Sequence, residues 1–212
     1  MTFAQFKVRL ARGVMRDDLL ASYGDFTNEA LQEIQQARSW TCMKKTATVT
    51  LPAGPGNETI ALPADFKELQ RRPAVHAIGD DGSFIPTDTV FEAQQIQRAY
   101  AFGGIPIMTC PIRNFLEVNT AGSVVGMVEP QTDVINYRVK YFAWLPPLVA
   151  DGDTSPFITS NMAMVLAKAK MIAFSDVNDP EADRQQGIYM EALASAIRAD
   201  AYSEVAGREL HM

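Results

Sequence analysis

The chain has 212 residues, of which 47% are hydrophobic and 21% are charged, and its net charge at pH 7 is −6. These proportions are those of an ordinary globular domain, so they argue against a disordered or fibrous chain. The acidic balance argues against a protein that grips nucleic acid through a broad basic face, because Lys and Arg supply most of the affinity for phosphate.

The acidic excess is concentrated near the C-terminus. Residues 151–212 carry ten acidic and five basic side chains, whereas residues 1–40 carry five of each. This balance is compatible with a surface past which DNA slides without sticking, since like charges repel.

Cysteine use and hydropathy indicate a protein made in the cytoplasm. Nothing beside Cys42 and Cys110 suggests a secreted disulfide scaffold, so we expect two free and mostly buried thiols. The N-terminus lacks the apolar stretch of a signal peptide. The longest apolar run, 162–174, contains two lysines and is too short for a bilayer, which needs about 20 apolar residues.

The first forty residues predict a helical hairpin. Thr2 and Gln5 have the spacing of a capping box, which predicts a first helix over about residues 3–20. A second helix is expected to begin at the N-cap Thr27 and to run towards Trp40, with the break between the helices at residues 23–25. One face of the first helix is apolar and consists of Phe3, Phe6, Leu10 and Val14.

From residue 44 onward, short segments separated by turn residues predict strands. The sequence Gly-Asp-Asp-Gly at 79–82 indicates a hairpin between two apolar segments. Apolar and polar residues alternate over 134–142, as expected for an antiparallel strand with one wet face. The expected strands are 46–51, 58–62, 74–78, 83–86, 113–120, 123–129 and 134–142, with a short helix capped by Thr89 and running to about Tyr100.

Helical patterns return after residue 150. Thr154 or Ser155 can cap a helix with Pro156 at its first position, where the missing N–H of proline is not needed. The run 162–174 is apolar on most sides and is therefore expected to be the most buried helix. Residues 179–180, Asp-Pro, begin the last helix by the same device, and Gly207 is expected to end it.

Two helices at each end that enclose a β-rich section predict an α+β fold. The terminal helix pairs, residues 1–43 and 151–200, are expected to pack on one another as a four-helix bundle. Residues 44–150 would form an inserted, antiparallel β-rich lobe, and residues 201–212 an extended C-terminal tail. A charge introduced at Leu166 should unfold such a protein, because the apolar run lies at the centre of the bundle.

No constellation of residues indicates catalysis. The two His and two Cys lack the paired spacing of a zinc site, and neither His76 nor His211 is placed for a Ser-His-Asp triad. Residues 54–57, Gly-Pro-Gly-Asn, are not followed by the Gly-Lys-Ser/Thr of a phosphate loop. Residues 80–81, Asp-Asp, are better explained as turn residues. We therefore expect no catalytic residue, no metal ion and no cofactor.

Several segments, taken in order, resemble the head-to-tail adaptor (connector) proteins of tailed bacteriophages and related prophages. Residues 62–66, Leu-Pro-Ala-Asp-Phe, resemble the Leu-Pro-x-Asp-Phe turn of that family, and 137–141, Tyr-Arg-Val-Lys-Tyr, resemble its strand with paired aromatics. Residues 145–148, Leu-Pro-Pro-Leu, then lead into the apolar helix. The sequence departs from many relatives in lacking a Trp-Leu pair ahead of the penultimate helix, and residues 79–110 differ as well.

The resemblance implies a virion protein of the phage neck, made in the host cytoplasm. It implies a ring, usually of twelve copies, that joins the portal protein to tail or nozzle proteins and lets double-stranded DNA pass without specific binding. No membrane and no catalytic residue are implied. The C-terminal segment is implied to dock against the portal, and its candidate docking residues are Tyr202, Val205, Leu210, His211 and Met212.

Three other classes of function stay open. A tail-tube or nozzle component would share the structural role, although the order of the helices favours the adaptor. An enzyme acting on the cell envelope or on nucleic acid would need a cleft with a perturbed acid, which the sequence does not show. A dimeric DNA-binding regulator would need a basic recognition helix.

Overall fold

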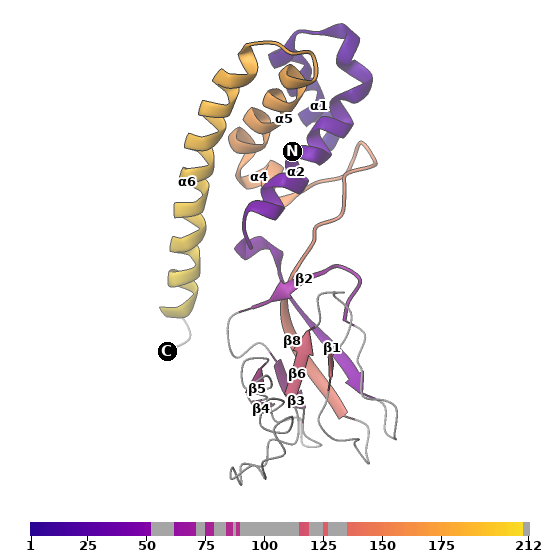
Figure 1. The fold of residues 1–212 in the computed structure, drawn as a ribbon, viewed down its shortest axis with the longest axis vertical. Helices are drawn as coiled ribbons and strands as arrows, with labels where there is room; N and C mark the ends of the chain where they lie inside the picture. The colour runs from indigo at the N-terminus through magenta and orange to yellow at the C-terminus, as the bar shows by residue number, and fades with distance from the viewer. Residues whose placement is uncertain are drawn as a thin grey trace, which may run out of the picture. The chain divides into compact units, whose positions relative to one another are not determined.

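A computed structural model describes residues 1–51, 62–70, 75–78, 84–86, 88–89, 115–118, 125–126 and 135–209 (Figure 1). The chain divides into two compact units. One unit, here called the helical unit, consists of residues 1–42 and 145–212, and the other, the strand unit, consists of residues 43–144. The α+β class predicted from the sequence is confirmed.

Helix α1 (Phe3–Val14) begins at the predicted capping box. The hydroxyl of Thr2 accepts the Gln5 N–H, and the Gln5 side chain accepts the Thr2 N–H at 3.0 Å. The four residues of the predicted apolar face are all buried. The helix ends earlier than predicted, because Met15 adopts a left-handed conformation with φ of 56° and residues Asp17–Ser22 form a separate 3-10 helix.

Helix α2 (Tyr23–Ala37) begins four residues before the predicted N-cap, so residues 23–25 form its first turn and the predicted break there is wrong. Thr27 lies inside the helix, where its hydroxyl donates to the Tyr23 carbonyl at 2.6 Å. The buried Tyr23 donates its own hydroxyl to the Arg16 carbonyl at 2.8 Å. This tertiary anchoring outweighs the weak helix propensity of the Tyr-Gly-Asp sequence.

The strand unit is organised around one long strand. β8 (Ile135–Ala143) pairs antiparallel with β1 (Lys44–Leu51) along its whole length, from Phe142 opposite Lys44 to Ile135 opposite Leu51. β8 also pairs with β2 (Phe66–Leu69) and β3 (Val75–Ile78), and β3 pairs with β4 (Phe84–Pro86), all antiparallel. The smaller sheet has the order β5 (Asp88–Thr89), β6 (Phe115–Val118), β7 (Val125–Gly126).

Most predicted strands have a counterpart, and the hairpin of β3 and β4 is confirmed. Three details differ. β5 and β6 are parallel, so the lobe is not purely antiparallel. Thr89 lies in β5 rather than capping a helix, and residues 90–100 lie outside the described residues. β2 was not predicted. The strand predicted over 58–62 cannot be compared over 58–61, which lie outside the described residues, and its last residue, Leu62, lies in no strand.

The C-terminal part of the helical unit contains α4 (Pro156–Ser160), α5 (Met162–Asp176) and α6 (Glu181–Glu209). Ser155 caps α4 as predicted, accepting the Phe157 N–H at 3.3 Å. α5 is the central helix, because it packs against α1, α2 and α6 (Figure 1). Val165 and Ala169 are completely buried, but Leu166 is only half-buried, so a charge at position 166 would not lie at the centre of the core as predicted.

Candidate functional site

Three helices of the helical unit meet at one buried lysine. Lys168, on α5, is 7% exposed, and its ammonium lies 2.5 Å from the carboxylate of Glu33 on α2. The same ammonium lies 5.2 Å from the ring centroid of Tyr189 on α6. Burial, and then the charge of Glu33, raise the pKa of Tyr189. One charge thus ties α2, α5 and α6 together, and its only signal in the sequence was a lysine within an apolar run.

A second polar contact fastens α6 to the end of α2. Asp200, on α6, lies 3.2 Å from the guanidinium of Arg38 and accepts the backbone N–H of Thr41 at 3.0 Å. Its side chain is 13% exposed, so both contacts are largely shielded from water. Nothing in the sequence pattern pointed to this pairing, because the residues are more than 150 positions apart.

The segment that follows α2 is fixed by a buried tryptophan. The Trp40 indole N–H donates to the Ile34 carbonyl at 2.8 Å, and the ring meets Phe157 edge-on at 5.6 Å between centroids. The Arg38 guanidinium lies 5.8 Å from the Trp40 ring. Asp200 is therefore attached to a rigid part of the helical unit.

Helix α6 extends well beyond the helix on which it packs. It has 29 residues, against 15 for α5, which correspond to lengths of about 43 and 22 Å at 1.5 Å per residue (Figure 1). Its buried side chains, Gln185, Tyr189 and Ala196, lie on one stripe that precedes Asp200. Tyr202, just after Asp200, is 75% exposed. The end of α6 thus presents an aromatic side chain to solvent.

The predicted docking residues are distributed over this end of the chain. Tyr202 and Val205 lie in α6, because residues 201–209 continue the helix instead of forming a separate extended tail. A helix that has already formed gains one hydrogen bond with each residue added to it, so the single glycine at position 207 does not end α6. Leu210, His211 and Met212 lie outside the described residues.

Residues 145–148, singled out in the sequence as an apolar and proline-rich segment, are attached to α2. Asn28 forms two hydrogen bonds with the backbone of Leu148, donating to its carbonyl at 3.0 Å and accepting its N–H at 2.9 Å. The Gln35 side chain accepts the Leu145 N–H at 2.7 Å. Two amide side chains of α2 therefore form hydrogen bonds with the backbone of this extended segment, as a neighbouring strand would in a sheet.

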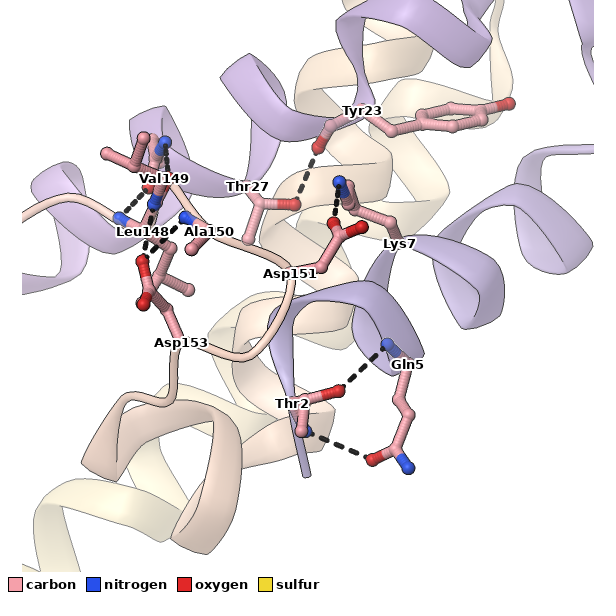
Figure 2. A network of polar contacts seen from close by, with 11 residues as sticks. Thr2, Gln5, Lys7, Tyr23, Thr27, Leu148, Val149, Ala150, Asp151 and Asp153 are labelled. Carbon is pink, nitrogen blue, oxygen red and sulfur yellow. Dashed lines mark hydrogen bonds and ion pairs between the residues drawn. The ribbon is translucent and has the colours of Figure 1, made fainter.

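The following turn caps α1, and Figure 2 shows the polar side-chain contacts around it. The Asp153 carboxylate accepts the N–H groups of Val149 and Ala150, each at 2.8 Å, and these bonds lower its pKa. The carbonyls of Asp153 and Asp151 accept N–H groups from the first turn of α1. Lys7 pairs with the Asp151 carboxylate at 2.8 Å. The N-terminal helix is thus fixed to the segment that re-enters the helical unit.

In the strand unit, the Leu-Pro-x-Asp-Phe segment forms a compact polar node. Its Asp65 carboxylate lies 2.6 Å from the Lys45 ammonium on β1 and accepts the Tyr141 hydroxyl on β8 at 3.0 Å. The Asp65 carbonyl accepts the Trp144 N–H at 2.7 Å, and Phe66 stacks on Tyr141 at 5.8 Å between centroids. The segment therefore works as a clip that joins β1, β2 and β8.

The described residues contain neither a metal site nor a membrane-spanning helix. Within them, no group of three or more His, Cys, Asp or Glu side chains could hold a metal ion. Cys42 is free, as expected, but exposed rather than buried. Cys110 and residues 54–57 and 80–81 lie outside the described part of the chain. No helix in that part is long and apolar enough to cross a membrane.

A family model described as "SU10 adaptor protein" matches residues 1–209. The chain therefore belongs to the SU10 adaptor protein family, a family of phage adaptors that are structural components of the virion. A comparison with curated proteins found no match.

Proposed function

We propose that this protein is the head-to-tail adaptor of a tailed phage. Copies of the chain form a ring, of twelve by analogy with the family, between the portal protein and the tail or nozzle proteins. Double-stranded DNA passes through the ring without specific binding. The observation that carries the proposal is the family match over residues 1–209, almost the whole chain.

In this proposal residues 1–43 and 151–200 act as a four-helix bundle of α1, α2, α5 and α6. The packing of α5 against the other three helices supports it. Residues 44–150 form the second lobe. The ten acidic and five basic side chains of residues 151–212 suit a surface that DNA passes without adhering.

Residues 201–212 are the portal-docking element. Tyr202 is 75% exposed and follows directly on the Asp200 contact, so it can enter a partner without disturbing the helical unit. Val205, Leu210, His211 and Met212 complete the element. Aromatic anchors of this kind contribute strongly to binding once a partner buries them.

Native mass spectrometry of the chain mixed with its phage's portal protein tests the proposal. We expect a discrete complex of about twelve copies on one portal ring, as the family resemblance implies. Association with tail proteins alone, and none with the portal at micromolar concentrations and low salt, would contradict it.

A chain truncated after Asp200 tests the docking element. Circular dichroism and melting should stay nearly unchanged, because the contacts of Asp200 with Arg38 and Thr41 are retained, while portal binding should be lost. Met190→Ser is the matched control, since Met190 is also exposed (55%) on α6 but lies outside the docking element. Docking by the truncated chain would show that the portal binds another face.

A further inference from the structure

The outward face of α1 is basic. Gln5, Val8, Arg9 and Arg12 follow one another at helical spacing and are all exposed, with Val8 52% exposed. No Asp or Glu occurs anywhere in α1. At 3.6 residues per turn, Arg12 and Gln5 lie in the middle of this face, and Val8 and Arg9 lie at its two edges. Arg9 also donates to the Met162 sulfur on α5 at 3.3 Å, so the positive charge of the face rests mainly on Arg12.

The outward face of α2 has the opposite character. Asp25, Glu29, Gln32 and Gln36 follow one another at spacings of four, three and four residues, and all four are exposed. No Lys or Arg occurs anywhere in α2. The face therefore carries two carboxylates and two long amide side chains, which can cover an apolar residue and hydrogen-bond at its edge.

The charges of these two faces are left over after the chain has formed its own ion pairs. Lys7 of α1 pairs with Asp151, and Glu33 of α2 pairs with Lys168. Among the residues that the structure describes, Arg12, Asp25 and Glu29 form no ion pair. The charge on the outward face of α1 is therefore positive, and the charge on the outward face of α2 is negative.

We propose that the outward face of α1 in one copy docks on the outward face of α2 in the next copy. This inference rests on the proposed function, because it supplies the contact by which the ring would close. The two faces are different surfaces of one chain, so a contact made in one direction only is heterologous and can close a ring. The same pairing made in both directions at once would give a two-fold dimer instead. Opposite charges set the register of the contact, and Val8 fills the space between the glutamines of the neighbour.

A second copy fits the observations better than a nucleic acid would. A nucleic acid would use only the two arginines of α1, on a chain whose net charge is −6, and would be repelled by the carboxylates of α2. A copy of the same chain uses both faces at once.

Charge reversal with rescue tests the contact. The full-length chain is cross-linked with glutaraldehyde over a series of concentrations, alone and on its portal, and the oligomers are resolved by mass. Arg12→Glu and Glu29→Arg should each lower the yield of trimers and larger species about tenfold, because like charges then face each other. The double variant should restore the yield to within about twofold of the wild type, since the charges are again opposite.

Arg198→Glu is the matched control, because Arg198 is an exposed arginine on α6, away from both faces. It should leave the yield unchanged, and the melting curves of all variants should coincide. Single reversals without effect, or a double variant without rescue, would overturn the proposal. Oligomers that stop at the dimer would also overturn the proposal. A wild-type chain that stays monomeric both alone and on its portal would overturn it as well. If the double variant restores the oligomers but the chain never binds a portal, the contact between α1 and α2 is supported and the adaptor function is refuted.

Discussion

The carboxylate of Asp200 lies 3.2 Å from the guanidinium of Arg38, which joins the last helix to the residue directly after α2. The aspartate also accepts the N–H of Thr41. Because the Asp200 side chain is only 13% exposed, these charge-assisted bonds are stronger than those of a surface ion pair. The contact therefore holds α6 against the helical unit just before the exposed Tyr202.

Asp200→Ala should loosen the C-terminal turns of α6. The substitution removes two contacts and leaves Arg38 partly buried without this partner, so we expect a local loss of about 1–2 kcal/mol. Hydrogen exchange of the amides of residues 197–209 measures this loss, and the melting temperature should fall only slightly. Glu191→Ala, at an exposed position of the same helix, is the control. Equal protection in both variants would refute a fastening role for Asp200.

The buried pair of Lys168 and Glu33 predicts an asymmetry between two substitutions. Glu33→Ala leaves a buried ammonium without its partner and should cost about 1–3 kcal/mol. This cost is smaller than that of breaking a fully buried pair, because the Glu33 side chain is 43% exposed. Lys168→Met removes the buried charge itself and should be nearly neutral or stabilising. Urea unfolding of both variants gives the two free energies. A Lys168→Met variant that is less stable than Glu33→Ala would contradict this ranking.

The polar node of the strand unit predicts a loss of stability at both extremes of pH. The hydrogen bond from Lys45, followed by that from Tyr141, lowers the pKa of Asp65 below its ordinary 3.8, so its contribution is present above that pH and is lost in acid. Burial and then the bond to Asp65 raise the pKa of Tyr141 from 10.0 to about 12. That contribution is present below about pH 10 and is lost as the pH rises towards 12.

Melting temperatures measured across the pH range, for the wild type and for Tyr141→Phe, test this assignment. The variant cannot ionise at position 141, so it should lose less stability between pH 10 and 12 than the wild type does. It should retain most of the acid loss, because the ion pair of Asp65 with Lys45 remains. Parallel curves above pH 10 would show that Tyr141 does not control the alkaline loss.

The centre of the helical unit is tested by a pair of neighbouring substitutions on α5. Val165 is completely buried, so Val165→Asp places an unpaired charge in the core and should cost several kcal/mol, enough to unfold the protein. Leu166 is half-buried, and its aspartate variant can turn the carboxylate towards water, so it should remain folded with a lower melting temperature. Far-UV circular dichroism distinguishes the two results. A folded Val165→Asp variant would refute the placement of the core.

Local signals were read correctly where the chain satisfies them locally. The capping box of Thr2 and Gln5 and the cap at Ser155 need only near neighbours, and both occur in the structure. Helix boundaries that depend on distant partners were missed. The start of α2 follows from the burial of Tyr23, which no window of sequence reveals.

The same limit applies to the contacts that make the site. Residues 62–66 were recognised by resemblance, but the partners of Asp65 come from strands 20 and 76 positions away. The pairing of Asp200 with Arg38 and the bonds from Asn28 to Leu148 likewise span more than a hundred residues. Tyr202, in contrast, is a docking candidate from the sequence analysis, and its side chain is exposed.

The thiol of Cys42 provides a last test, because it lies close enough to Asp200 to sense its charge. Partial desolvation of the sulfur, followed by the carboxylate of Asp200, raises the pKa of Cys42 from 9.0 to about 11. Alkylation proceeds through the thiolate, so this exposed cysteine should react about a hundredfold more slowly at pH 8 than an ordinary thiol. The rate of iodoacetamide labelling, measured against pH in a Cys110→Ser background, gives the pKa directly. Adding Asp200→Asn should lower it by removing the nearby negative charge, while Glu191→Gln should not. An unchanged profile in the Asp200 variant would show that desolvation alone raises the pKa and that the carboxylate does not act on the thiol.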